Sequence, residues 1–86
     1  MDKLKLLENK IRELDSNLRM GNAHQFTIDY LETLSEEIEL QRTGENGVED
    51  ETYLNATEYN LENVLEIMRP DTEDYLIIQS VLSVLK

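Results

Sequence analysis

The positions of glycine and proline constrain the fold of this chain more than any other feature of its sequence. Only three glycines and one proline occur in 86 residues, and they fall at three places: Gly21, Gly44 with Gly47, and Pro70. Between these breaks the apolar residues recur every three or four positions, which is the period of an amphipathic α-helix. No segment alternates apolar and polar residues for long enough to make a paired strand. The sequence therefore predicts an all-α fold.

The three breaks divide the chain into four predicted helices of a single domain, residues 1–86. An acidic loop is expected at 43–50. The helices are expected at about 2–20, 22–42, 51–69 and 71–85. Because short connections favour antiparallel neighbours, we predict a compact antiparallel bundle of four helices. A three-helix bundle is the alternative if 22–42 is less regular.

Polar residues next to the breaks are the predicted helix ends. Gly21 can adopt the left-handed conformation that ends a helix. Asn22 or Thr27 would cap the second helix, because short polar side chains accept hydrogen bonds from its free N–H groups. Asp71 or Thr72 would cap the fourth helix in the same way.

The first helix carries an unbroken apolar seam with the spacing of a coiled coil. The seam consists of Leu4, Leu7, Ile11, Leu14 and Leu18. This seam, and the wide apolar face of 71–85, exceed what a minimal bundle has to bury. We therefore predict a homodimer that shares one of these two helices, with a monomer as the alternative.

The charge of the chain excludes several partners. Eight Lys and Arg residues stand against nineteen Asp and Glu residues, for a net charge of −11. Nucleic acids and anionic membrane surfaces would repel such a chain, so we expect neither as a direct partner. No apolar run approaches the ~20 residues that cross a bilayer. A cytoplasmic location is the expectation.

The sequence contains no recognisable catalytic or cofactor-binding motif. It has no cysteine, and a single histidine, His24, cannot supply the ligand cluster that zinc requires. The acidic loop lacks the ligand spacing of a calcium-binding loop. We therefore expect no enzyme activity, no cofactor and no dedicated metal site.

Two rows of carboxylates are the most informative surface feature. The first row, on 22–42, lies opposite the apolar seam and consists of Asp29, Glu32, Glu36 and Glu39. The second row, on 51–69, consists of Glu58, Glu62 and Glu66, with Tyr59 beside it. Such residues lie ~5–6 Å apart along a helix, close to the spacing of phosphates along a nucleic-acid strand. The rows either imitate a phosphate backbone or only keep the protein in solution.

These observations lead to two functional hypotheses. In the first, a small acidic, DNA-mimic-like protein occludes a basic surface of a nuclease or another nucleic-acid enzyme, as an immunity protein, an antitoxin or a phage-type inhibitor would. The carboxylates of both rows would steer the encounter, and Tyr59 would be an anchor. In the second, the protein is a coiled-coil-like structural or adaptor module that pairs through the seam of the first helix.

Overall fold

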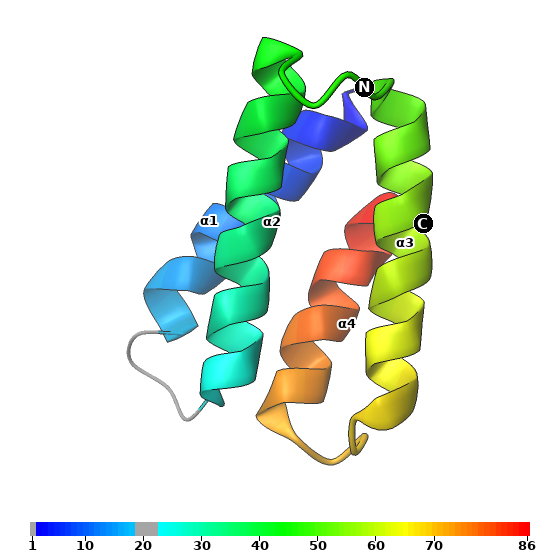
Figure 1. Ribbon diagram of the computed structural model, residues 1–86. Coiled ribbons are helices and arrows are strands. Elements are labelled where there is room, and N and C mark those ends of the chain that lie inside the picture. The colour runs from blue at the N-terminus through cyan, green and yellow to red at the C-terminus, as the bar shows by residue number, and fades with distance from the viewer. Residues whose placement is uncertain (1, 19–22) are drawn as a thin grey trace.

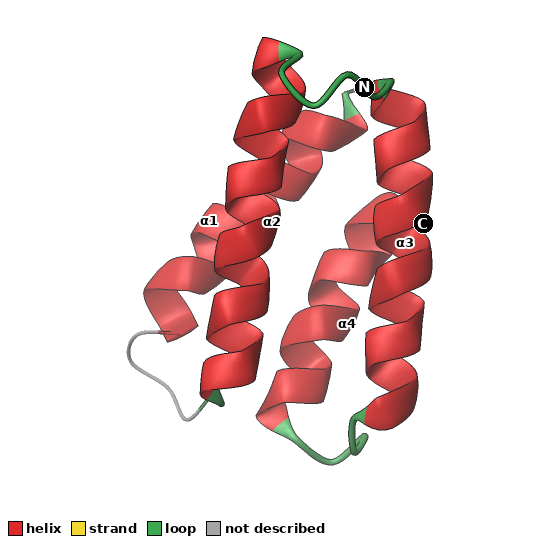
Figure 2. Cartoon of the chain, viewed as in Figure 1, coloured by secondary structure: helices red, strands yellow, loops and turns green. Residues whose placement is uncertain are grey.

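The protein is an all-α bundle of four helices, as predicted. The computed structural model describes the backbone of residues 2–18 and 23–86, and the side chains of residues 2–15 and 23–86. The helices are α1 (Lys3–Leu18), α2 (Gln25–Thr43), α3 (Asp50–Ile67) and α4 (Glu73–Leu85) (Figure 1). Loops account for the rest of the described chain, which contains no strand (Figure 2). The three-helix alternative is therefore excluded.

Consecutive helices run in opposite directions, and each pair that a short connection joins is in contact. Close contacts join α1 to α2, α3 to α4, and α1 to α4. In Figure 1, α2 and α3 stand in front, and α1 and α4 lie behind them. The pairs α2–α3 and α2–α4 are not among the close contacts.

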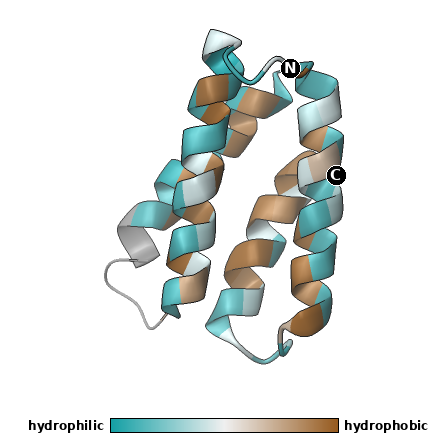
Figure 3. Cartoon of the chain, in the orientation of Figure 1, coloured by the Kyte–Doolittle hydropathy of each residue, from teal (hydrophilic) through white to brown (hydrophobic). Residues whose placement is uncertain are grey.

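One core between the helices holds the bundle together. All four helices contribute to it, and α4 is apolar along most of its length (Figure 3). The buried apolar residues are Leu4, Leu7, Ile11, Leu31, Leu34, Ile38, Leu61, Ile78, Val81, Leu82 and Leu85. Fully burying one such side chain stabilises the fold by roughly 1.5–3 kcal/mol.

The described part of the apolar seam of α1 lies in the core of the single chain. Leu4, Leu7 and Ile11 are at most 4% exposed, and Leu14 packs against the same core. The side chain of Leu18 lies outside the described residues. The seam therefore needs no second chain to bury it, and a dimer through these residues would require the bundle to open. The homodimer itself stays a prediction.

The start of α2 differs from the prediction. Gly21 and Asn22, the predicted end and cap at the first connection, lie outside the described residues. α2 begins after His24, whose backbone is extended and whose side chain makes no capping hydrogen bond. The alternative prediction that Thr27 caps α2 is wrong, because Thr27 lies inside the first turn and is fully buried. At the other end of α2, Gly44 adopts the left-handed conformation (φ 76°) that only glycine takes at little cost.

The connection from α3 to α4 follows its sequence signals. Thr72 is the cap of α4, since its hydroxyl oxygen accepts a hydrogen bond from the backbone N–H of Tyr75 at 3.2 Å. Asp71, the other predicted cap, precedes Thr72 and is not the capping residue. α3 ends two residues before the predicted Arg69. Pro70 accounts for the exclusion of Arg69 from the helix, because a proline disfavours the helical conformation of the residue before it, and Met68 is already extended.

Candidate interaction surface

Four carboxylates stand on the side of α2 that faces away from the core. We call them the α2 acidic row: Asp29, Glu32, Glu36 and Glu39. The other side of the helix is fixed by Leu31, Leu34 and Ile38, which are buried. Because an α-helix turns 100° per residue, burying these three residues forces the row outward. All four side chains are exposed, as the sequence predicts.

The α2 acidic row has little internal compensation of its charge. Within the described part of the chain, no cationic group lies at ion-pair distance from Glu32, Glu36 or Glu39. Arg12 shares a hollow between α1 and α2 with Glu32 and Glu36. Its guanidinium, however, pairs with Glu8 at 3.5 Å. Among the described residues, these three carboxylates are therefore not engaged by a cation, and the Asp29 carboxylate accepts a hydrogen bond from the Gln25 amide at 2.8 Å.

The second predicted row is different, because lysines from other parts of the bundle lie beside it. We call Glu58, Glu62 and Glu66 the α3 acidic row. The Lys86 ammonium lies 3.5 Å from the Glu62 carboxylate, although no base interrupts the row in the sequence. The charge of the α3 acidic row is therefore partly neutralised by the protein itself.

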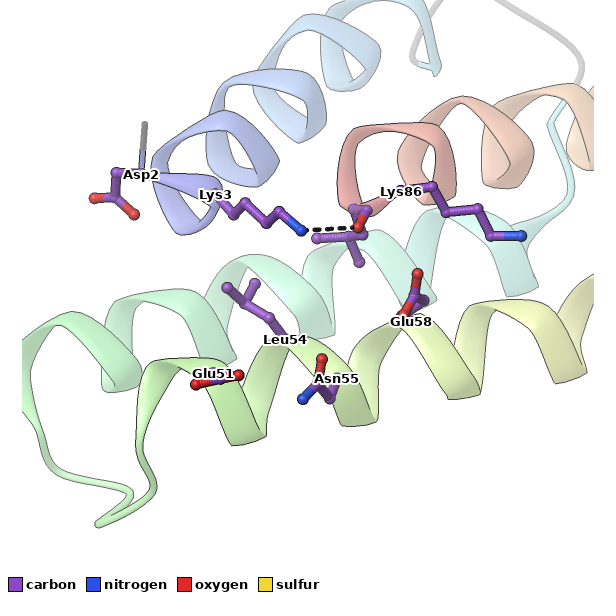
Figure 4. A pocket seen from close by; sticks show the side chains of 8 residues that line it. Asp2, Lys3, Glu51, Leu54, Asn55, Glu58 and Lys86 are labelled. Carbon is purple, nitrogen blue, oxygen red and sulfur yellow. Dashed lines mark hydrogen bonds between the residues drawn. The ribbon is translucent and has the colours of Figure 1, made fainter.

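A hollow of mixed charge surrounds one end of the α3 acidic row (Figure 4). Glu51, Asn55 and Glu58 reach it from α3, and Lys3 and Lys86 reach it from the ends of α1 and α4. The Lys3 ammonium also donates a hydrogen bond to the carbonyl of Leu85, at 3.3 Å, near the end of α4. These lysines lower the local negative potential around Glu58, because they line the same hollow.

The two rows border different grooves. Glu32 and Glu36 line the hollow between α1 and α2. Glu62 and Glu66 line a hollow between α3 and α4, together with Tyr75 and Gln79. The rows therefore form two separate surfaces.

Tyr59 lies on the exposed side of α3, as predicted. Its side chain is 66% exposed, which leaves most of the ring open to a partner and excludes burial beneath the acidic loop. The remaining tyrosines are half-buried, and two of them, Tyr30 and Tyr53, pack against the core.

A buried glutamine, Gln41, fixes the loop between α2 and α3. Its amide nitrogen donates hydrogen bonds to the carbonyl of Val48 and to the carboxylate of Asp50. Its amide oxygen accepts a hydrogen bond from Asn46. Gln41 follows the apolar seam in the sequence, and a polar residue at such a position is the one signal that could have pointed to this anchor.

A tyrosine of α3 and a glutamate of α2 connect these two helices. The Tyr53 hydroxyl donates a hydrogen bond to the Glu37 carboxylate at 3.3 Å, from α3 to α2. Burial raises the pKa of Tyr53 to about 12, and the charge of Glu37 adds to the rise. Burial raises the pKa of Tyr30 as well, again with a smaller effect of Glu37. The sequence contains no signal for this pairing, because it depends on how α2 and α3 face each other.

The described residues form neither a metal cluster nor a membrane-spanning helix. Among residues 2–18 and 23–86, no three histidine, aspartate or glutamate side chains gather closely enough to hold a metal ion. None of the helices described is both long and apolar enough to cross a membrane.

Comparison with known proteins gives no relative from which a function could be transferred. The chain matches no protein-family model, no curated protein and no solved structure.

Proposed function

We propose that this protein is a small acidic binding protein that neutralises a basic protein partner by occluding its nucleic-acid-binding surface. The α2 acidic row is the observation that carries the proposal. Its four carboxylates are exposed at helical spacing, and three of them have no cation at ion-pair distance among the described residues. Like charges at this spacing destabilise a helix by a few tenths of a kcal/mol per pair, roughly. A cationic partner would remove that repulsion.

The spacing and the total charge indicate the kind of basic surface. The Cβ atoms of residues one turn apart stand ~5–6 Å from each other, and carboxylates at this spacing suit a surface that neutralises a line of phosphates. The net charge of −11 would steer such a partner toward the protein and would make the association rate fall with salt. A nuclease or another nucleic-acid enzyme fits this description. The protein would then be an immunity protein, an antitoxin or a phage-type inhibitor.

The α2 acidic row has the main role in this proposal. The α3 acidic row borders another groove, and one of its carboxylates, Glu62, forms an ion pair with Lys86. With Tyr59, this row forms a second contact region on α3. The competing adaptor hypothesis requires the apolar seam of α1 to pair with another helix. Leu4 and Leu7 of this seam are buried in the core of the single chain, which favours the acidic surface as the binding site instead.

Affinity capture from a lysate, at low and at high salt, tests the proposal. We expect a nucleic-acid-binding protein to be retained at low salt and released at high salt, because exposed charges are screened by ions. The purified partner should then lose its binding to nucleic acid when this protein is added. Recovery of only a salt-insensitive helical partner, or of a homo-oligomer alone, would contradict the proposal and favour the adaptor hypothesis.

A further inference from the structure

An apolar hollow lies at the start of α2, beside the α2 acidic row. Its lining is largely apolar and comes from the first turn of α2, the end of α3 and the turn between α3 and α4. Phe26, Ile67 and Met68 are the apolar residues of this lining. Ile67 is 79% exposed and Phe26 is 54% exposed, although a globular protein buries most residues of these types. The last turn of α3 is visible as an apolar patch in Figure 3.

The hollow is held in place by the fold. The buried Asp74 carboxylate accepts hydrogen bonds from the His24 backbone N–H at 3.0 Å and from the Thr27 hydroxyl at 2.7 Å. These bonds fix the first turn of α2 against the start of α4. The Phe26 ring also packs on Tyr30, with the ring centroids 6.2 Å apart. The α2 side of the hollow is therefore held in a fixed position, which reduces the entropy lost when a ligand binds.

The surroundings of the hollow are acidic. Asp29 follows Phe26 by one turn of α2, Glu66 precedes Ile67, and Glu73 opens α4; all three are exposed. Arg69 lies on the lining, and its guanidinium pairs with Asp71 at 3.6 Å. A second copy of this chain would bring another net charge of −11 to the same place. Charge complementarity therefore favours a cationic occupant.

We propose that this hollow receives one large apolar side chain from a cationic protein segment whose lysines or arginines contact the α2 acidic row. We call it the anchor hollow. The inference rests on the proposed function and specifies the partner: a leucine-like or aromatic residue with basic residues on both sides. Charge steers the encounter, and the apolar anchor supplies contact area that salt does not screen.

Two synthetic peptides test the anchor hollow without the natural partner. Both are basic and helix-forming, and they differ only at one central residue, leucine or alanine. At low salt we expect the leucine peptide to bind about tenfold more tightly, as the burial of one such side chain implies. Chemical-shift changes in the protein should gather at Phe26, Ile67 and Met68 as well as along the α2 acidic row.

Single substitutions on the protein assign the effect to the hollow. Ile67→Ser removes an exposed lining residue, and Leu76→Ser, a 59% exposed residue of α4 outside the lining, is the matched control. We expect Ile67→Ser to abolish the preference for leucine and Leu76→Ser to keep it. Equal binding of the two peptides, or an unchanged preference in Ile67→Ser, would overturn the anchor hollow while the proposed function stands.

Two further results concern charge and self-association. If an uncharged leucine peptide binds as tightly as the basic one, or if Ile67→Ser dissolves a homodimer seen by sedimentation, the cationic occupant is wrong. If neither basic peptide binds at low salt, the anchor hollow and the proposed function both fail. A preference for leucine that is lost in Ile67→Ser and weakened by salt is the result that we expect.

Discussion

Thr27 donates its hydroxyl to the Asp74 carboxylate at 2.7 Å, and both side chains are buried although 47 residues separate them in the sequence. The same carboxylate oxygen accepts the His24 backbone N–H. One buried aspartate therefore binds the first turn of α2 to the first turn of α4. These hydrogen bonds set the position of α2 on the bundle, and with it the position of the candidate surface.

Replacing Asp74 should destabilise the whole bundle. Asp74→Ala leaves the Thr27 hydroxyl and the His24 N–H without their partner, and hydrogen bonds to a charged group contribute about 1.5–3 kcal/mol. We expect a loss of that size in the free energy of unfolding, measured by urea denaturation. Asp74→Asn retains an acceptor oxygen and should lose less. Asp71→Ala, at a carboxylate that is 72% exposed, is the control. An equal effect of the two alanine substitutions would contradict the role of Asp74.

The sequence predicts the helices well, because helix formation here depends on local signals. Each signal acts on residues only a few positions away along the chain. Examples are the period of the apolar residues, Gly44 at the end of α2 and Thr72 at the start of α4. The exposure of the α2 acidic row is also predictable, since burying Leu34 and Ile38 fixes the opposite face.

Contacts between helices could not be predicted in this way. The hydrogen bonds of Asp74 with Thr27 and of Tyr53 with Glu37 join segments whose relative position depends on the packed core. The Lys86 ammonium near Glu62 has the same origin. Sequence spacing describes one helix at a time, and for this reason the two acidic rows look alike in the sequence and differ in the fold.

Core truncation in α1 distinguishes a core role of the seam from a pairing role. Leu7 is fully buried in the single chain, so Leu7→Ala should cost about 2–5 kcal/mol of unfolding free energy. We expect the loss to appear in chemical denaturation and to be independent of protein concentration. Leu76→Ala, on the exposed side of α4, should change stability by less than about 0.5 kcal/mol. A Leu7→Ala variant that keeps its stability but loses an oligomer would favour the adaptor hypothesis.

The raised pKa of Tyr53 predicts a loss of stability at alkaline pH. Burial raises its pKa from 10.0 to about 12, so the folded state favours the protonated hydroxyl. The resulting stabilisation is fully present below pH 10, the pKa of the unfolded chain, and disappears as the pH rises to about 12. We expect the free energy of unfolding to fall more steeply over this window in the wild type than in Tyr53→Phe. Parallel curves for the two proteins would contradict this assignment.

Neutralising the α2 acidic row should not harm the fold. The variant Asp29→Asn, Glu32→Gln, Glu36→Gln, Glu39→Gln removes repulsion between neighbours on α2, worth about 0.2–0.5 kcal/mol per pair. We expect an unchanged or higher Tm in thermal unfolding followed by circular dichroism. In contrast, Glu62→Gln removes the exposed ion pair with Lys86 and should lower stability by at most about 1 kcal/mol. A marked fall in the Tm of the α2 variant would mean that the row has a structural role.

Competition with nucleic acid tests the central claim most directly. The captured partner is bound to a labelled nucleic acid, and fluorescence anisotropy follows the release of that nucleic acid as this protein is added. The wild type should displace the nucleic acid, and the fourfold α2 variant should fail to do so. A variant with Glu58, Glu62 and Glu66 changed to glutamine should retain most of the effect. Simultaneous binding of the nucleic acid and this protein, or undiminished displacement by the α2 variant, would contradict the claim that the α2 acidic row occludes a nucleic-acid-binding surface.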